Sequence, residues 1–142
     1  MNNTTAPINQ TTSAFSVGIP PLHGSILLVE DESFVREVTA EILVTAGYHV
    51  LKARSAVEAI LEFRQHKGEV ALLLVDVVLP GKNGRDMAKE LMKEEPGLKT
   101  VFMSGYPEGA TDQNSIRNTI YLPKPFSLGS LMQKIRDVIA MN

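Results

Sequence analysis

Residues 70–84 read VALLLVDVVLPGKNG, an apolar run that ends in a single acidic residue, Asp76, and continues into a segment rich in Pro and Gly. A run rich in Val and Leu that is closed by turn-forming residues is typical of a strand buried on both faces of a parallel sheet. Asp76 would then lie at the carboxyl end of this strand. Because ligands bind at that edge of open α/β sheets, Asp76 is the first candidate for a functional residue.

Four more short apolar runs are predicted to be strands, at 25–29, 48–51, 100–103 and 119–122. Helical spacing follows four of the five strands. The apolar positions are Phe34, Val35, Val38, Ile42 and Leu43 within 33–46, Ala56, Ala59, Ile60 and Phe63 after Ser55, Met87, Leu91 and Met92 after Asn83, and Leu128, Leu131, Met132, Ile135, Val138 and Ile139 after Ser127. Ser55, Asn83 and Ser127 are predicted helix N-caps, with Ser55 and Glu58 forming a capping box. A further short helix is expected in the weakly patterned segment 107–118.

Five strands that alternate with five helices predict an α/β fold in which helices cover both faces of one parallel sheet. The expected topology is flavodoxin-like, a three-layer sandwich with strand order 2-1-3-4-5. In that order the first and third strands are neighbours, which would bring Glu30 and Asp31 next to Asp76. Ser104 and Lys124, at the ends of the fourth and fifth strands, would lie at the same edge.

The composition fits one folded domain within 142 residues, with expected bounds of 23–142. Residues 1–22 are rich in Asn, Thr, Pro and Ser and are expected to form a flexible leader or linker. The sequence has no cysteine, which excludes disulfides and cysteine-based metal sites and fits a cytoplasmic protein. A formal net charge of −2 with dispersed basic residues argues against direct binding of nucleic acid. The longest apolar run is too short to cross a membrane.

Three carboxylates at one edge of the sheet need a counter-charge, because at close range they repel one another by about 4 kcal/mol per pair. Mg²⁺ suits this edge, since it binds carboxylate oxygens, keeps several waters and bridges to phosphate oxygens. Lys124 can neutralise the remaining charge and bind a phosphoryl oxygen. Asp76 then becomes a candidate nucleophile that attacks phosphorus and forms an aspartyl phosphate.

The residues at the strand ends resemble the receiver domain of two-component response regulators. The matching motifs, spread over about residues 24–139, are Glu30-Asp31, Asp76 with Pro80-Gly81 and Gly84, Ser104-Gly105, and Lys124-Pro125-Phe126. The resemblance implies that Asp76 accepts a phosphoryl group from a phosphohistidine of a histidine kinase or a histidine phosphotransfer protein. It also implies that Glu30, Asp31, Asp76 and the backbone carbonyl of Val78 hold Mg²⁺.

The same resemblance assigns roles around the acceptor. Ser104 and Lys124 would each bind a phosphoryl oxygen, and the Lys124–Pro125 peptide bond would be cis. Tyr121 matches the family's switch aromatic, which turns inward when the Ser104 hydroxyl moves toward the phosphoryl group. Phosphorylation would thereby change a surface formed by segment 107–118, the strand that carries Tyr121 and the last helix. A homodimer through this surface is one arrangement that the resemblance allows.

The phrases VDVVLPGKNGRDMA and VFMSGYPEGA also resemble the receivers attached to hybrid sensor histidine kinases, which would make the leader a linker from a kinase core. A stand-alone response regulator is the alternative. In both cases the domain itself is expected to be a phosphoacceptor switch, whereas a parent hybrid chain would be a histidine kinase. The resemblance also implies that the positions of Val78 and Tyr106 modulate access of the hydrolytic water, and because both residues are bulky and non-acidic, slow to moderate self-dephosphorylation is expected.

Other interpretations remain open from the sequence. A phosphatase of the haloacid dehalogenase type also uses an Asp nucleophile and Mg²⁺, but it needs a second Asp where this chain has Val78. A nucleotide hydrolase would need a G-x-x-x-x-G-K-[ST] loop, which the sequence lacks. A degenerate receiver that only docks a partner would have lost site residues that are all present here. Asp76 could also be a structural carboxylate that caps the turn at Gly81.

Overall fold

A computed structural model describes residues 21–105 and 118–141 of the chain. Its elements, in chain order, are β1 (Ser25–Val29), α2 (Ser33–Thr45), β2 (Val50–Ala53), α3 (Ala56–Gln65), β3 (Val70–Asp76), α4 (Gly84–Glu94), β4 (Lys99–Ser104), β5 (Thr119–Pro123) and α5 (Leu128–Ala140). The helix expected at 107–118 lies outside the described residues but for Asn118, and so does nearly all of the leader expected at 1–22.

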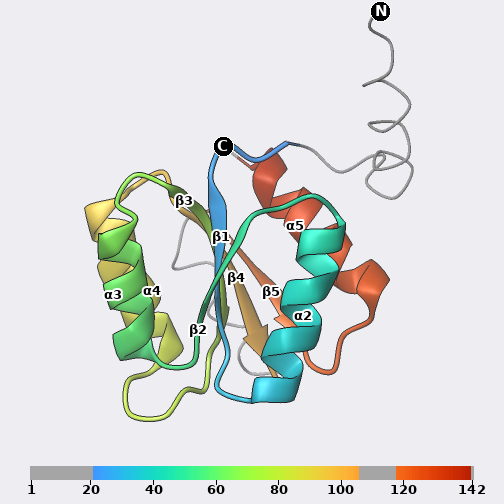
Figure 1. Ribbon diagram of the computed structural model, residues 1–142, viewed down its shortest axis with the longest axis horizontal. Coiled ribbons are helices and arrows are strands. Elements are labelled where there is room, and N and C mark those ends of the chain that lie inside the picture. Colours follow the sequence, from blue (N-terminus) through green and yellow to red (C-terminus); the bar gives the residue numbers. More distant parts are fainter. Residues whose placement is uncertain (1–20, 106–117, 142) are drawn as a thin grey trace, which may run out of the picture.

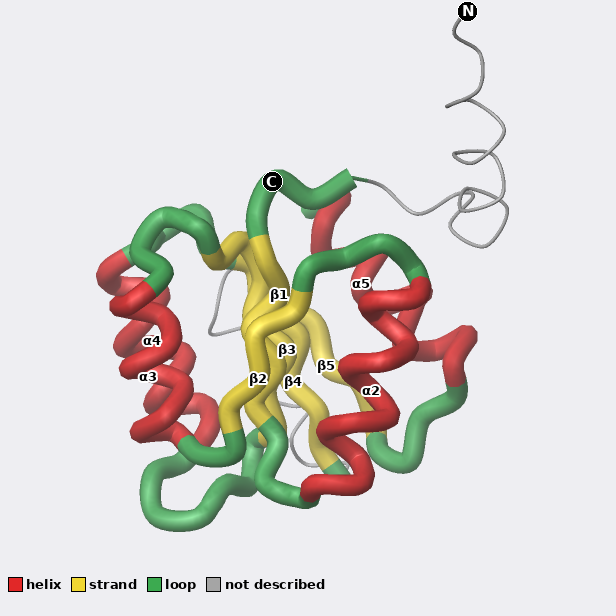
Figure 2. Tube along the Cα trace, viewed as in Figure 1, coloured by secondary structure: helices red, strands yellow, loops and turns green. Residues whose placement is uncertain are grey.

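The strands form one parallel sheet with the order β2-β1-β3-β4-β5. Helices α3 and α4 cover one face of the sheet, and α2 and α5 cover the other (Figure 1). Figure 2 shows the strands as a middle layer between these two helix pairs. The predicted three-layer α/β fold and its strand order are confirmed.

The central strand β3 is buried on both faces, as its unbroken apolar run predicts. Leu73 and Val75 belong to the core beneath α3 and α4, where Phe63 and Met87 also lie. The alternate residues Leu72 and Leu74 belong to the second core, beneath α2 and α5, with side chains such as Leu43, Leu131 and Ile135. Because successive side chains of a strand point to opposite faces, a strand between two helical layers needs apolar residues at every position.

The second strand lies two residues later than predicted, at 50–53 rather than 48–51. The preceding helix explains the shift. Gly47 has a φ of 106°, and the Tyr48 N–H then donates to the Leu43 carbonyl at 3.0 Å. Tyr48 is therefore hydrogen-bonded to the last turn of α2 and follows a left-handed glycine that reverses the chain, so it does not begin the strand. The ranges predicted as 25–29, 33–46, 100–103 and 119–122 agree with the structure to within one residue at each end.

The apolar stripe predicted for 33–46 is correct only in part, because Leu43 is buried and Ile42 packs against the core, but the N-terminal part of the stripe does not face the sheet. The face that meets the sheet consists of Thr39, Ala40 and Leu43, whereas Phe34 is 79% exposed and Val38 is 40% exposed. Helix α5 follows its predicted stripe more closely, with only Leu128 at its start exposed. Helix α2 thus has a second apolar surface that faces solvent.

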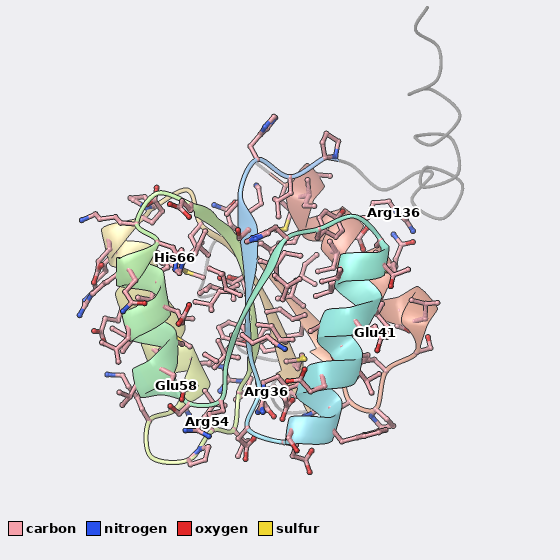
Figure 3. The ribbon with its side chains drawn as sticks, viewed as in Figure 1. Arg36, Glu41, Arg54, Glu58, His66 and Arg136 are labelled. Atoms are coloured by element: carbon pink, nitrogen blue, oxygen red, sulfur yellow. The ribbon has the colours of Figure 1, made fainter. Side chains whose placement is uncertain are left out.

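The three predicted N-caps are confirmed. Asn83 accepts hydrogen bonds from two backbone N–H groups of α4, and Ser55 and Ser127 each accept one. The capping box at Ser55 is only half present, because Glu58 bonds to the backbone and side chain of Arg54 instead (Figure 3). No helix in the described parts of the chain is long and apolar enough to cross a bilayer.

Candidate functional site

Asp76 is the last residue of β3 and is only 6% exposed. Both of its carboxylate oxygens are held. Oδ1 accepts a hydrogen bond from the backbone N–H of Val78 at 2.9 Å, and Oδ2 accepts one from Lys124 Nζ at 2.9 Å. The neighbouring strand β4 continues the ladder past Asp76, since the Val77 N–H donates to the Met103 carbonyl at 2.9 Å. The carboxylate is therefore fixed at the carboxyl edge of the sheet, as predicted.

The loop after Asp76 returns to it through Gly84, the first residue of α4. The Gly84 N–H donates to the Val77 carbonyl at 2.9 Å. A Cβ at Gly84 would lie 2.1 Å from the Asp76 carbonyl oxygen and 3.1 Å from the Val77 Cα. Only glycine allows this approach, so α4 begins directly against the backbone of the candidate acceptor.

Glu30 follows β1 and is fully buried. Its carboxylate accepts hydrogen bonds from Lys124 Nζ at 2.9 Å and from the Glu32 backbone N–H at 3.1 Å. Its backbone carbonyl accepts one from Arg36 Nη1 at 2.9 Å, and Figure 3 labels this arginine on α2. Burial raises the pKa of Glu30 above its ordinary value, although the hydrogen bond from Lys124 opposes this rise.

Lys124 lies between the two carboxylates. Its backbone N–H donates to the Ser104 carbonyl at 2.8 Å, which extends the pairing of β4 with β5 and sets the position of the side chain. Burial by itself lowers the pKa of Lys124, but the hydrogen bonds to Asp76 and Glu30 outweigh it and leave that pKa raised. Lys124 is thus held in its charged form. The Lys124–Pro125 bond is cis, as the resemblance implied.

Asp31 completes an acidic cluster with Glu30 and Asp76. One carboxylate oxygen from each of these residues can be chosen so that all three lie within 4.8 Å of one another. Asp31 is exposed, whereas the other two are buried, so the cluster opens to solvent on the Asp31 side. Hard oxygen ligands at an open edge are the donor set that suits Mg²⁺. Val78, two residues after Asp76, is 57% exposed.

Ser104 and Tyr121 are both buried, on neighbouring strands. Ser104 ends β4 and pairs in register with Pro123, while Phe102 pairs with Tyr121. The Tyr121 ring packs on Phe102, with a centroid distance of 5.3 Å. Tyr121 therefore points inward. Tyr106, the other residue named for its effect on hydrolysis, lies outside the described residues.

The sequence interpretation missed two arginines at this edge. Arg36 binds the backbone of Glu30, and Arg85 Nε donates to the Tyr121 hydroxyl at 3.0 Å. The separation of 36 residues between Arg85 and Tyr121 leaves no local pattern that could have paired them. The apolar residues at 34 and 38 were visible in the sequence, but only the register of α2 shows that they face solvent.

The comparisons with known proteins agree with this geometry. The family model of the response regulator receiver domain matches residues 26–136. The sensor kinase CckA of Brucella abortus is 38% identical over 117 residues, which cover 81% of this chain but only 12% of the kinase. The response regulator receiver protein CpdR of the same organism is 31% identical over 116 residues, which cover 80% of this chain and 95% of CpdR.

Two solved structures are also similar. The receiver domain of the hybrid histidine kinase CckA has a TM-score of 0.70 and 33% identity, covering 82% of this chain and 99% of that domain. The response regulator TrrA of Thermotoga maritima, solved in complex with Mg²⁺ and BeF, has a TM-score of 0.71 and 28% identity over 81% of this chain and 98% of TrrA. The length of the match, together with the sheet order around Asp76, establishes that the chain belongs to the response regulator receiver domain family of two-component systems.

Proposed function

We propose that Asp76 accepts a phosphoryl group from a phosphohistidine of a partner protein, so that the chain acts as a switch in two-component signalling or a phosphorelay. The observation that carries this proposal is the bridge of two 2.9 Å contacts from the Lys124 ammonium to Asp76 and Glu30. A carboxylate that is fixed beside a cation at the open end of a parallel sheet has the position and the charge that an acceptor needs.

In the transfer, a bond would form between an Asp76 carboxylate oxygen and phosphorus while the bond between phosphorus and the donor histidine nitrogen breaks. Lys124 would exchange its hydrogen bond to Asp76 Oδ2 for one to a phosphoryl oxygen. Its charge would then stay beside the charge of the transferred group. The Ser104 hydroxyl, at the end of the adjacent strand, is the candidate donor to a second phosphoryl oxygen.

The carboxylate cluster fits Mg²⁺ as a cofactor. Glu30, Asp31 and Asp76 would supply carboxylate oxygens, and Val78 its backbone carbonyl. Three carboxylates and the ammonium of Lys124 leave negative charge at the site, which a divalent cation balances. When bound, Mg²⁺ would neutralise charge on the oxygens of the transferred group.

The output of the switch would follow from Ser104 and Tyr121, through a change in the surface formed by segment 107–118, β5 and α5. Segment 107–118 lies outside the described residues but for Asn118. A homodimer through this surface is part of the proposal.

The likeness to CckA supports a receiver of a hybrid sensor kinase, with residues 1–22 as its linker and 23–142 as the domain. The likeness to CpdR keeps a stand-alone regulator as the alternative. A cytoplasmic location without nucleic-acid or membrane contact completes the proposal.

Incubation with acetyl phosphate and Mg²⁺, followed by intact-mass measurement, tests the proposal. A receiver gains one phosphoryl group per chain, in an adduct that is stable in acid and labile in base. Absence of such an adduct with every donor tried would overturn the proposal. Multiple turnover of an unrelated phosphate ester would instead favour the phosphatase, which the lack of an Asp at position 78 already disfavours.

Asp31→Asn tests the metal part of the proposal. In the presence of EDTA the variant should be more stable than the wild type by about 1 kcal/mol, because one repulsive charge is gone from the cluster. This corresponds to a rise of about 4 °C in Tm. Added Mg²⁺ should raise the Tm of the wild type but raise that of the variant much less. Asp86→Asn, at an exposed carboxylate on α4, is the control and should respond to Mg²⁺ as the wild type does.

We further propose that the phosphodonor protein docks on the solvent-facing apolar surface of α2. A groove of about 430 Å³ runs from this helix to Lys124 and Pro125, and its apolar lining includes Phe34, Val38 and Phe126. A donor histidine must approach to bonding distance of Asp76, so the donor's surface has to cover the rim of the site. An apolar rim matches an apolar face on the donor.

Phe34→Ser should slow phosphotransfer from a protein donor about tenfold or more, because an exposed aromatic residue at the rim of an interface is a candidate hot spot. Labelling by acetyl phosphate should not change, since that small donor needs no docking surface. The donor would be the phosphorylated kinase or phosphotransfer domain that labels the wild type fastest in a panel that includes the Brucella abortus CckA kinase. Val44→Ser, at an exposed valine near the far end of α2, is the matched control. Equal loss with both donors would argue against docking.

A further inference from the structure

The Tyr121 side chain is held by a residue from a different part of the chain. Arg85 Nε donates to the Tyr121 hydroxyl at 3.0 Å, and the Arg85 Cζ lies 5.6 Å from the centroid of the ring. Phe102 packs on the same ring from β4. Tyr121 is 7% exposed, and a buried tyrosine hydroxyl needs a hydrogen-bond partner, which Arg85 supplies.

The backbone of Arg85 is held close to Asp76. It follows Gly84, whose backbone N–H donates to the Val77 carbonyl at 2.9 Å, and its own backbone N–H donates to the Asn83 side chain at 2.7 Å. The base of the arginine therefore cannot shift without moving the loop behind the acceptor. At the other end of the contact, Tyr121 lies three residues before Lys124 on the same chain segment. The contact thus joins the first turn of α4 to β5.

The positive charge of Arg85 is unfavourable at the start of a helix, so its presence there needs a reason. A cation in the first turn of a helix faces the positive end of the helix dipole, which disfavours it. A charge-assisted hydrogen bond together with a cation placed near an aromatic ring offsets that cost. An arginine at this position that pointed into water would make neither of these favourable contacts. The contact with Tyr121 therefore accounts for an arginine at position 85 better than a role in solubility does.

We propose that Arg85 is a positioning residue that holds the Tyr121 ring inward before any phosphoryl group is present. The inference rests on the proposed function, in which Tyr121 is the switch residue and faces inward in the phosphorylated state. A contact that favours the inward ring then favours the phosphorylated state by the same factor, because the two equilibria share one conformation. Arg85 would in this way set how readily the chain switches.

The ring orientation is measured directly with 3-fluorotyrosine and ¹⁹F NMR on the full chain without added ligand. The chain has three tyrosines, and the Tyr121 resonance is the one that Tyr121→Phe removes. In Arg85→Leu the equilibrium between inward and outward rings should shift outward by roughly tenfold, as expected for loss of a charge-assisted hydrogen bond. Lys89→Leu, one turn further along α4 at an exposed lysine, should leave the resonance unchanged.

The link to switching is measured with beryllium fluoride and Mg²⁺ as the phosphoryl mimic. Its affinity should fall at least twofold in Arg85→Leu, since the competent state is then less populated. In a Tyr121→Phe background, which keeps the ring but lacks the hydroxyl, Arg85→Leu should have a smaller effect. An unchanged Tyr121 resonance, or equal affinity in wild type and Arg85→Leu, would overturn the role of Arg85. If the wild type does not bind the mimic at all, the proposed receiver function fails, and the ¹⁹F result still decides whether Arg85 holds the ring.

Discussion

Replacing Asp76 by Asn is expected to abolish phosphoryl incorporation from acetyl phosphate, leaving the intact mass of the variant unchanged. The amide retains the shape of the side chain and an oxygen that can accept from the Val78 N–H or from Lys124. What the substitution removes is the negative charge and nucleophilicity of the carboxylate. The loss should therefore be complete while the fold is kept, which thermal unfolding of the variant checks.

Two controls make this result specific to the acceptor. Asp86→Asn changes an exposed carboxylate outside the site and should be labelled to the same extent as the wild type. Borohydride reduction of the labelled wild type should convert the acyl phosphate at position 76 to an alcohol, which peptide mapping can locate. Labelling of Asp76→Asn at the wild-type level, or a reduced residue elsewhere in the chain, would show that Asp76 is not the acceptor.

Gly84→Ala is expected to have the largest effect on stability of any substitution of this size near the site. The added Cβ would lie 2.1 Å from the Asp76 carbonyl oxygen, and the nearest atoms are backbone atoms, which cannot rotate away as a flexible side chain could. The start of α4 would have to move off β3. We expect a loss of about 3 kcal/mol in the free energy of unfolding, which corresponds to a fall of about 10 °C in Tm.

Gly97→Ala is the matched control, because a Cβ at Gly97 would meet no atom within 4 Å. Its free energy of unfolding should stay within about 0.5 kcal/mol of the wild type. Urea titration of both variants gives the comparison. Since α4 also carries Arg85, any Gly84→Ala protein that folds should be labelled at Asp76 more slowly than the wild type. Equal stability of the two variants would contradict this prediction, because it would show that the first residues of α4 can move away from β3 at little cost in free energy.

The sequence was sufficient where one physical signal dominated. The unbroken apolar run of β3 predicted a parallel sheet, because only a strand that lies between two helical layers tolerates apolar residues at every position. The N-caps Asn83 and Ser127 were predicted because a short polar side chain before a helical stripe has one favoured role. The meeting of Glu30, Asp76 and Lys124 then followed from the strand order alone.

The sequence was insufficient where two signals competed or where the partner is distant in the chain. Tyr48 has high strand propensity, but the left-handed Gly47 before it and its hydrogen bond to Leu43 hold it in the turn after α2, outside β2. Phe34 and Val38 fit a helical stripe, yet the small side chains of Thr39 and Ala40 allow α2 to approach the sheet on a different face. The contact of Arg85 with Tyr121 has no local signal, because tertiary structure alone brings them together.

The solvent-facing apolar residues of α2 have a consequence for fidelity in a crowded cell. If the proposed function holds, small phosphodonors would reach Asp76 without using this surface, whereas a protein donor that covers it would gain the free energy of removing Phe34 and Val38 from water. The rate advantage of the protein donor would then be set by a region that takes no part in the chemistry. Changes on this one helical face could redirect the chain to another donor, or insulate it from unwanted ones, while the acceptor itself stays the same.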